Sequence, residues 1–205
     1  MTAYKDYGFR SAQWSCIHAY LLGPIVNKLN TRKGRKIIDI GCGNGWMTNH
    51  LIAHGFDAYG TDASESGIAI ARQTHPDRFF VQDLTQNALP PALQGINFDT
   101  ILSTEVIEHL YSPREYLDYC KSILGTEGEI ILSTPYHGYL KNIALSVSGQ
   151  MDKHFTALWD GGHIKFWSRE TLTRLLEERG FRQVRFAGCG RLPYLWKSMI
   201  VTAKL

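Results

Sequence analysis

Short apolar runs, separated by polar and glycine-containing breaks, recur along the chain from residue 37 to its end. Runs rich in Ile, Val, Leu and Phe predict strands, and longer segments with apolar residues at helical spacing predict helices. The predicted strands are 37–40, 57–61, 78–82, 98–103, 129–134, 183–187 and 199–203, and the predicted helices are 45–54, 64–74, 112–124 and 168–179. Strands that alternate with helices in this way predict an α/β fold, with a parallel sheet covered by helices on both faces.

Two regions depart from this alternation. Residues 1–36 are rich in aromatic side chains and contain two short amphipathic stretches, around 17–21 and 24–29. We expect an N-terminal helical lid there, and the alternative is a helix that simply packs against the sheet. Residues 136–167 form an apolar insertion between the predicted strand 129–134 and the predicted helix 168–179. We place this insertion on the substrate side. The chain as a whole, 1–205, is expected to form a single domain.

Composition limits the function only broadly. The 22 basic and 19 acidic residues nearly balance, so net charge gives no support to a nucleic-acid or membrane partner. The four cysteines are scattered with no CxxC pair, which is typical of buried thiols in a reducing compartment. No window approaches the roughly 18 apolar residues that a membrane-spanning helix needs. We therefore expect a cytoplasmic protein.

A glycine-rich turn follows the first predicted strand, in the segment Asp39-Ile40-Gly41-Cys42-Gly43-Asn44-Gly45. Glycines at alternate positions suit a tight turn that a ligand approaches closely, and the helix that follows directs its first amides at the same place. The third glycine comes one residue too early for a dinucleotide fingerprint, and Trp46 occupies its expected position. No Gly-Lys-Ser/Thr sequence follows, so a P-loop is excluded as well.

Two acids extend this pattern along the chain. Asp62 ends the second predicted strand, roughly 20 residues after the turn, where an acid can accept both ribose hydroxyl groups. Asp83 ends the third strand, where it can accept from an exocyclic adenine amine. Each acid alone is more often a capping or turn residue than a ligand contact. Together with the glycine turn, in this order, they predict a site for an adenosine-containing cofactor.

Residues 37–134 resemble the class I S-adenosylmethionine-dependent methyltransferases. This resemblance implies a Rossmann-like, doubly wound sheet of seven strands, mostly parallel, with an antiparallel last strand. It also implies that S-adenosylmethionine is the cofactor and that the chain is an enzyme. The cofactor contacts carried over by position are Asp39, Gly41, Cys42, Gly43, Asn44 and Gly45 for the methionine part, Asp62 and Ala63 for the ribose, Asp83 and Leu84 for adenine, and Thr104 near the sulfonium.

The candidate chemistry lies after the fourth strand, at the edge where open parallel sheets bind ligands. If a helical turn starts there, Glu105, Glu108 and His109 share one face. Two carboxylates and an imidazole can hold a divalent cation such as Mg²⁺ or Mn²⁺, with His163 as a fourth ligand. The alternative needs no metal: His109 and His163 then act as bases or hydrogen-bond donors, with Glu108 beside them. The residue pattern leaves both alternatives open.

A narrower resemblance concerns Glu-x-x-Glu-His after the fourth strand, Ser-Thr-Pro after the fifth, and the later His163. These motifs are similar to the ubiquinone-pathway O-methyltransferases and to the small-RNA 3′-terminal 2′-O-methyltransferases, two groups in which a cation binds adjacent oxygens. In the second group the ligands correspond to Glu105, Glu108, His109 and His163.

The apolar insertion distinguishes these two groups. RNA binding would favour a cluster of Lys and Arg, whereas an apolar stretch favours an aromatic or lipophilic substrate or a membrane surface. We therefore expect O-methylation of a small aromatic or lipophilic hydroxyl compound, peripheral membrane contact through the insertion, no nucleic-acid partner and no obligate protein partner. The alternatives are RNA 2′-O-methylation, small-molecule N- or C-methylation, and a cofactor-binding module without catalysis.

Overall fold

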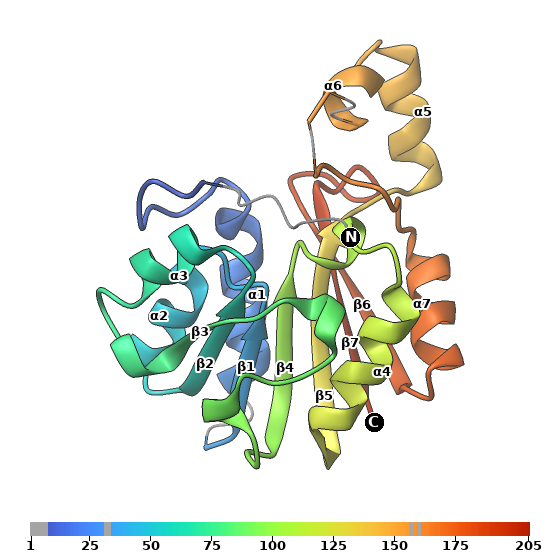
Figure 1. Ribbon diagram of the computed structural model, residues 1–205. Helices are drawn as coiled ribbons and strands as arrows, with labels where there is room; N and C mark the ends of the chain where they lie inside the picture. Colours follow the sequence, from blue (N-terminus) through green and yellow to red (C-terminus); the bar gives the residue numbers. More distant parts are fainter. Residues whose placement is uncertain (1–7, 31–33, 156–157, 160) are drawn as a thin grey trace.

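The computed structural model describes residues 8–30, 34–155, 158–159 and 161–205, and its centre is a seven-stranded sheet (Figure 1). The strands lie in the order β3-β2-β1-β4-β5-β7-β6. Their bounds are β1 (Lys36–Ile40), β2 (Asp57–Asp62), β3 (Phe79–Val81), β4 (Phe98–Thr104), β5 (Leu124–Pro135), β6 (Arg182–Cys189) and β7 (Ser198–Lys204). The first five strands pair in parallel, and β7 runs antiparallel to both β5 and β6. The predicted fold class is confirmed.

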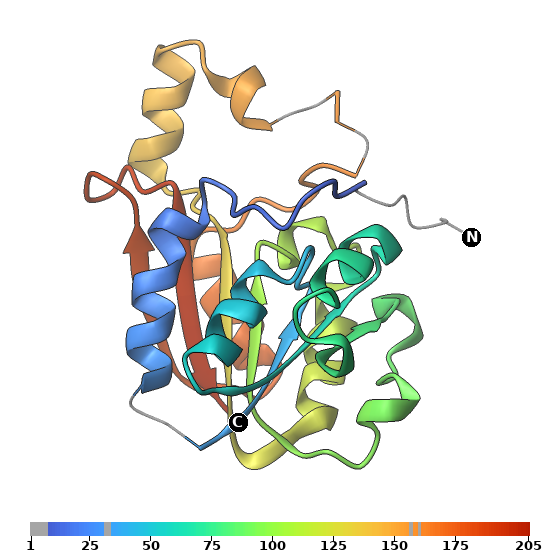
Figure 2. The same ribbon diagram turned by 90° about the vertical axis from the view of Figure 1, so that its left-hand side faces the viewer.

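Helices cover both faces of this sheet (Figures 1 and 2). They are α1 (His18–Asn30), α2 (Trp46–Ala53), α3 (Glu65–Ala71), α4 (Pro113–Ile123), α5 (Tyr139–Val147), α6 (Met151–Phe155) and α7 (Arg169–Glu178). Among the described residues, four single-turn 3₁₀ helices lie in the connections: η1 (Pro76–Arg78), η2 (Leu84–Gln86), η3 (Pro91–Leu93) and η4 (Ile107–His109). Helices α1 and α2 pack on one face of the sheet, while α4 and α7 pack on the other face.

Alternate residues of each central strand supply the two faces, as the strand period of two requires. Ile37 belongs to the cluster with α1 and α2, whereas Ile38 and Ile40 belong to the cluster with α4 and α7. Each of these isoleucines is at most 1% exposed. Full burial of one such side chain contributes roughly 1.5–3 kcal/mol, so apolar burial on both faces fixes the strand register.

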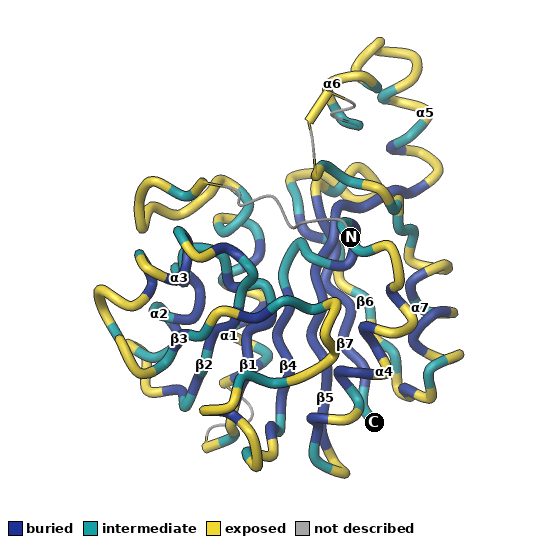
Figure 3. Tube along the Cα trace, in the orientation of Figure 1, coloured by how far each residue is buried: buried dark blue, intermediate teal, exposed yellow. Residues whose placement is uncertain are grey.

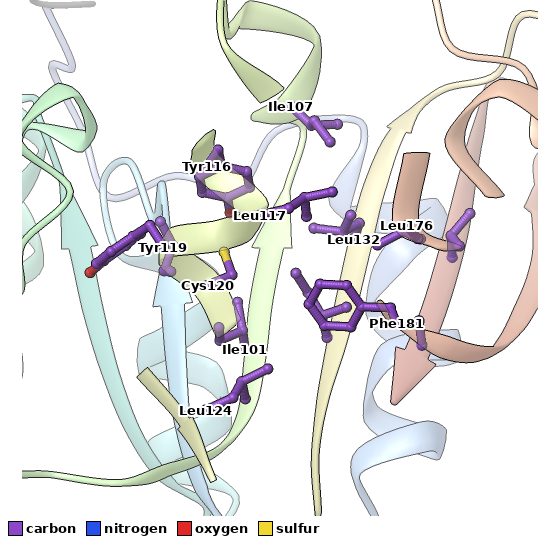
Figure 4. Close-up of a cluster of buried hydrophobic side chains, with 14 of the residues drawn as sticks. Ile101, Ile107, Tyr116, Leu117, Tyr119, Cys120, Leu124, Leu132, Leu176 and Phe181 are labelled. Carbon is purple, nitrogen blue, oxygen red and sulfur yellow. The ribbon is translucent and has the colours of Figure 1, made fainter. Parts of the chain in front are cut away.

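The larger cluster holds the sheet between α4 and α7. Tyr116, Leu117 and Cys120 point from α4 toward the sheet, and Leu176 and Phe181 approach from the α7 side (Figure 4). Leu117, Cys120 and Leu176 are fully buried. This packing fixes the end of β4, from which the candidate catalytic loop begins.

The region 136–167 leaves the sheet at its carboxyl edge. Helices α5 and α6 project above that edge, away from the rest of the fold (Figures 1 and 2), and most of their backbone trace is exposed or half-buried (Figure 3). Tyr139 is 79% exposed and Val147 is 85% exposed, although both are large and apolar. No helix among the described residues combines the length and apolar character that crossing a membrane requires.

Three details of the predicted elements need correction. The two amphipathic stretches before residue 30 form one helix, α1, with Pro24 inside it. Strand β5 begins at Leu124 rather than at 129, because Leu124 pairs with Phe98 across a register shift. The antiparallel strand is last in the chain but not at the edge of the sheet, since β7 lies between β5 and β6. Residues 1–7 and 31–33 of the expected lid, and residues 156, 157 and 160 of the insertion, lie outside the described residues.

Candidate active site

The sheet has a topological switch point between β1 and β4. From β1 the chain proceeds to β2 on one side, and from β4 it proceeds to β5 on the other side. The loops that follow β1 and β4 therefore border one crevice at the carboxyl edge, where open α/β sheets bind ligands. The two loops touch: a Cβ added to Gly41 would overlap the Val106 side chain.

The three glycines of the turn after β1 all have left-handed backbone conformations. Their φ angles are 80° at Gly41, 56° at Gly43 and 73° at Gly45, a region that residues with side chains rarely adopt. Gly45 is also crowded, because an added Cβ would overlap Ala71 and lie 2.8 Å from the Phe79 ring. The turn thus needs glycine for its conformation and, at Gly45, for packing, and it brings the backbone to the surface of the crevice.

Asp62 ties this turn to the end of β2. Its two carboxylate oxygens accept hydrogen bonds from the Gly43 amide at 2.8 Å and from the Ser64 amide at 2.7 Å. The same turn receives support from Thr61, whose carbonyl accepts from the Gly41 and Cys42 amides at 2.7 and 3.0 Å. Asp62, the predicted ribose contact, therefore lies beside the glycine turn and also holds that turn in its conformation.

Asp39 and Cys42 lie below the turn. Asp39 is fully buried, and one of its oxygens accepts from the Thr48 hydroxyl at 2.6 Å. Burial raises the pKa of Asp39 to about 7, and the nearby Asp62 adds to that rise. Burial also raises the pKa of the Cys42 thiol well above its ordinary value. The Cys42 side chain is buried against Ile68, Ala71 and Phe79, so its backbone rather than its thiol is suited to face a ligand.

An N-terminal segment crosses over the turn. The Asn44 side-chain amide donates to the carbonyl oxygens of Ser11 and Gln13, at 2.9 and 3.0 Å. The Phe9 ring lies against Gly43, where an added Cβ would be 2.9 Å away. The segment 9–13 is thus held on the cradle by contacts with Gly43 and Asn44 of the turn.

The remaining predicted cofactor residues line the same edge. Asp83 follows β3, and its carboxylate accepts from the amide and the hydroxyl of Thr85 at 2.9 and 2.8 Å. Leu84 is half-buried next to it, and Ala63 is half-buried directly after Asp62. Thr104 ends β4 opposite Ser133. All four thus follow or end parallel strands, at the carboxyl edge where the crevice opens.

Glu108, His109 and His163 come together on the opposite side of the crevice. One candidate ligand atom from each lies within 4.8 Å of the other two, and among the described residues this is the one such group of three. The rings of His109 and His163 have their centroids 4.9 Å apart. Glu108 is 1% exposed, and neither of its carboxylate oxygens has a hydrogen-bond partner of good geometry in the described part of the chain.

Backbone contacts bring His163 to the loop after β4 across a long sequence separation. The Ile164 and Lys165 amides both donate to the Glu108 carbonyl, at 2.9 and 3.0 Å. His109 Nδ1 lies 2.9 Å from the Gly161 carbonyl oxygen. Because a carbonyl can only accept, Nδ1 carries the proton, and Nε2 keeps its lone pair for a proton or a metal ion.

Burial controls the charge of this cluster. It lowers the pKa of His109, and it lowers the pKa of His163 to about 4, with His109 and His154 contributing to the shift of His163. Both imidazoles are therefore expected to be neutral at pH 7. Burial, and then the neighbouring Glu105 carboxylate, raise the pKa of Glu108 well above its usual range. A bound cation would offset the cost of an ionised carboxylate here.

Glu105 does not join this cluster, contrary to the expectation that it shares a helical face with Glu108 and His109. The helical turn η4 begins only at Ile107, and Glu105 has a left-handed φ of 57°. Its carboxylate turns back to the sheet, where it accepts from the Ser133 and Ser198 hydroxyls at 2.8 and 2.7 Å. The two acids are three residues apart, as a shared helical face would require, but the backbone between them is not helical.

Three further residues that sequence reasoning did not single out border the site. His137 and His154 have ring centroids 4.9 Å apart, and burial lowers the pKa of each to about 4. Lys141 is 8% exposed, and its ammonium donates to the Lys197 carbonyl at 3.3 Å. Burial lowers the pKa of Lys141 to about 8. His137 comes two residues after the end of β5, and this position was a usable signal because it lies at the same sheet edge. His154 and Lys141 gave no such signal.

Comparison with known proteins identifies the family. A family model described as a methyltransferase domain matches residues 10–185. The chain belongs to the class I S-adenosylmethionine-dependent methyltransferases. Membership in this family makes S-adenosylmethionine the cofactor expected in the glycine cradle. The individual cofactor contacts assigned above remain predictions.

Similar proteins share both sequence and fold. A ubiquinone biosynthesis O-methyltransferase from Dinoroseobacter shibae is 32% identical over 168 residues, which cover 79% of this chain and 66% of that protein. The mitochondrial ubiquinone biosynthesis O-methyltransferase of Arabidopsis thaliana is 35% identical over 105 residues, covering 50% of this chain and 33% of that protein. This chain thus spans about two thirds or less of these relatives' lengths.

Among solved structures, magnesium protoporphyrin IX methyltransferase from Synechocystis with bound S-adenosylhomocysteine has a TM-score of 0.69 and 22% identity. The match covers 97% of this chain and 90% of that one. At this identity the likeness shows the fold alone.

Proposed function

We propose that the protein transfers a methyl group from S-adenosylmethionine to a hydroxyl oxygen of a small aromatic or lipophilic compound, with assistance from a divalent cation such as Mg²⁺ or Mn²⁺. The observation that carries the proposal is Glu108, a buried carboxylate without a good hydrogen bond that faces two neutral imidazoles across the crevice from the cofactor cradle. The O-methyltransferases among the similar proteins support oxygen as the acceptor.

The residues present fit a cation. Glu108, His109 and His163 offer one carboxylate and two imidazoles within 4.8 Å of one another. The Gly161 carbonyl fixes the proton of His109 on Nδ1, which is the second contact that metal-bound histidines commonly make. Three protein ligands leave open positions for two adjacent substrate oxygens. When bound, the cation would lower the pKa of an attached hydroxyl and orient its oxygen.

The chain's own residues position the reactants. The glycine cradle and Asp62 hold the cofactor from one side of the switch point, and the loop after β4 presents the acceptor from the other side. In the transfer, the acceptor oxygen forms a bond to the methyl carbon while the carbon–sulfur bond breaks. The hydroxyl proton leaves at the same time. Without a cation, His109 Nε2 is placed to receive it; with a cation held by His109 Nε2, the proton would pass to solvent water.

The N-terminal segment is proposed to act as a lid. Phe9 lies on Gly43, and Asn44 holds the backbone at Ser11 and Gln13. Helix α1 itself is anchored, because Leu21, Ile25 and Leu29 are buried against the sheet. We therefore assign the closing role to the segment 9–13 and the supporting role to α1.

The insertion is proposed to contact a membrane surface or a lipophilic substrate. Helix α5 exposes Tyr139, Leu140 and Val147, at 79%, 54% and 85%. An apolar helical face of this kind partitions into the interface between lipid headgroups and acyl chains. Flotation with anionic liposomes should recover the wild type and lose a Leu140→Asp, Val147→Asp double variant. Equal recovery of both would exclude this role for α5.

The function is tested by binding first and chemistry second. Calorimetric titration with S-adenosylmethionine should show binding, and its absence at high micromolar concentration would end the methyltransferase proposal. Catechol and related ring-hydroxylated compounds serve as acceptor probes. Exhaustive chelation should reduce methylation at least tenfold and added Mn²⁺ should restore it.

The variant Glu108→Gln keeps the shape of the side chain but removes the charge, so it should lose Mn²⁺ binding measured by electron paramagnetic resonance. The matched control is Glu115→Gln, an exposed acid in the first turn of α4. If chelation leaves the methylation activity unchanged, the cation is removed from the proposal and His109 remains as the base. Failure of methylation with every hydroxyl probe, together with intact cofactor binding, would reopen nitrogen, carbon or RNA acceptors.

A further inference from the structure

A pocket of the protein has none of the cluster residues Glu108, His109 and His163 in its lining. It has a volume of about 360 Å³ and is bordered by the start of α7, the end of β6 and the segment 190–196. Its lining includes Tyr136, Phe186, Tyr194 and Trp196, with Arg169 and Gly188. The size falls within the range of small-molecule sites in proteins. None of these residues takes part in the methyl-transfer site proposed above.

The walls of this aromatic pocket are rings in mutual contact. The Trp196 ring lies 5.2 Å from Tyr136, 5.5 Å from Phe186 and 5.3 Å from Tyr194, centroid to centroid. These separations are typical of edge-to-face and tilted aromatic pairs. Tyr136 is buried, Phe186 and Trp196 are half-buried, and Tyr194 is 60% exposed. The pocket therefore has a buried ring, Tyr136, on one side and an exposed ring, Tyr194, on the side open to solvent.

Glycines allow the rings to take these positions. An added Cβ on Gly188 would overlap the Trp196 indole, and an added Cβ on Gly138 would overlap the Tyr136 phenol. Tyr194 has a left-handed φ of 64°, which is uncommon for a bulky residue. The aromatic arrangement thus depends on specific backbone positions in three separate segments.

Arg169 gives the pocket a charge. Its guanidinium carbon lies 5.3 Å from the centre of the Phe186 ring, and its side chain forms no hydrogen bond or ion pair with the residues that the structure describes. Arg174, on the same helix, instead pairs with Glu178 at 3.3 Å. A guanidinium stacked on an aromatic ring still has its N–H edge free to bind an oxyanion in two parallel hydrogen bonds.

We propose that the aromatic pocket is a second binding site, and that its ligand is a planar aromatic compound carrying a carboxylate or a similar oxyanion. The rings supply stacking surfaces for the aromatic body, and Arg169 pairs with the anion at the rim. A quaternary ammonium ligand, which aromatic cages also bind, would be repelled by Arg169. The site is separate from the acceptor position: Tyr136 lines this pocket, whereas the next residue, His137, packs against Phe155 and Phe166.

The probe is 2-naphthoate, with the uncharged 2-naphthamide as its matched ligand, each titrated calorimetrically into the full chain. The wild type should bind naphthoate more tightly than naphthamide. Arg169→Gln should weaken naphthoate at least tenfold and leave naphthamide within about twofold, because it removes only the charge-assisted pair. Trp196→Leu should weaken both ligands. Arg174→Gln, on the same helix, should change neither.

Glu108→Gln separates this site from the acceptor site. If naphthoate occupies the aromatic pocket, this variant binds it as the wild type does, whatever becomes of methyl transfer. Loss of naphthoate binding in Glu108→Gln with retention in Arg169→Gln would overturn the proposal and place the ligand at the acceptor position. An absence of naphthoate binding to the folded wild type at millimolar concentration would overturn it as well.

Discussion

The turn after β1 and the loop after β4 border the same crevice, but they are held in place by different kinds of contact. The turn uses three glycines within five residues, and the backbone amides of Gly41, Cys42 and Gly43 all donate to the next strand, at Thr61 and Asp62. The loop depends on distant segments: Gly161 and His163 reach it from the insertion. A loop that is held by neighbouring residues can be predicted from the sequence, whereas a loop that is held by distant segments can be predicted only in part.

The same difference between local and long-range contacts separates the proposed cofactor-binding region from the region proposed to select the acceptor. Backbone amides and a single carboxylate shape the cradle, and such groups serve any substrate that the enzyme methylates. In the proposed function, side chains from two elements far apart in the chain shape the acceptor side. Under that proposal, changes in the insertion should alter the acceptor without disturbing the cradle.

The largest expected effect is on folding, at Gly45. Gly45→Ala should lower the free energy of unfolding by about 2–4 kcal/mol, because an alanine there is both strained at φ 73° and crowded by Ala71 and Phe79. The matched control is Gly55→Ala, which has a φ of 82° but no atom near the added Cβ, and which should cost only about 1 kcal/mol. Urea denaturation measures both. Equal losses would show that conformation alone, and not packing, requires glycine in the turn.

The second effect is on cofactor binding, at Asp62. Asp62→Ala removes the acceptor for the Gly43 and Ser64 amides as well as the predicted ribose contact, so affinity for S-adenosylmethionine should fall on the order of 100-fold. Asp57→Ala is the control: Asp57 begins the same strand at its far end and pairs with Arg78. Calorimetry should find the control within about twofold of the wild type. A similarly small change in Asp62→Ala would remove this acid from the cofactor site.

Most of the fold was predictable because the decisive signals are local. Apolar runs and glycine stops located every strand of the sheet, and the turn at Gly41–Gly45 could be assigned by its spacing. Boundaries failed where pairing with another strand decided them: β5 extends back to Leu124 because Phe98 lies opposite. The placement of β7 inside the sheet likewise depends on pairing with β5 and β6, which no pattern within residues 198–204 specifies.

The candidate site was predictable by residue type but not by geometry. Glu108, His109 and His163 were named together from the sequence, and the structure brings them together. Glu105 was grouped with them on the assumption of a continuous helical turn, and the left-handed φ at this residue, which the sequence does not signal, turns it away. The aromatic pocket was not foreseen, since its rings come from three segments with no common motif.

Glu105 provides the third prediction, which separates it from Glu108. Glu105→Ala should lower the free energy of unfolding by about 1–2 kcal/mol, because it leaves the Ser133 hydroxyl without its acceptor and weakens the link to Ser198. Its affinity for Mn²⁺ should stay within about threefold of the wild type, unlike that of Glu108→Gln. Equal loss of Mn²⁺ affinity in both variants would return Glu105 to the ligand set.

The smallest expected effect is a pH dependence of stability that arises in the insertion, at His137. Burial lowers the pKa of His137 from 6.5 to about 4 in the folded protein, with His154 contributing. Between these pH values the unfolded chain therefore binds the proton more tightly than the folded chain does. Stability should fall as the pH decreases through this window and should be unaffected by this group above pH 6.5.

His137→Phe removes the titrating group but keeps a ring to stack on Phe155, so its stability should fall less steeply with acid than that of the wild type. We expect a difference of about 1–2 kcal/mol accumulated across the window, measured by urea denaturation of the chelator-treated protein at several pH values. Parallel slopes for His137→Phe and the wild type would mean that acid does not act on the insertion through His137.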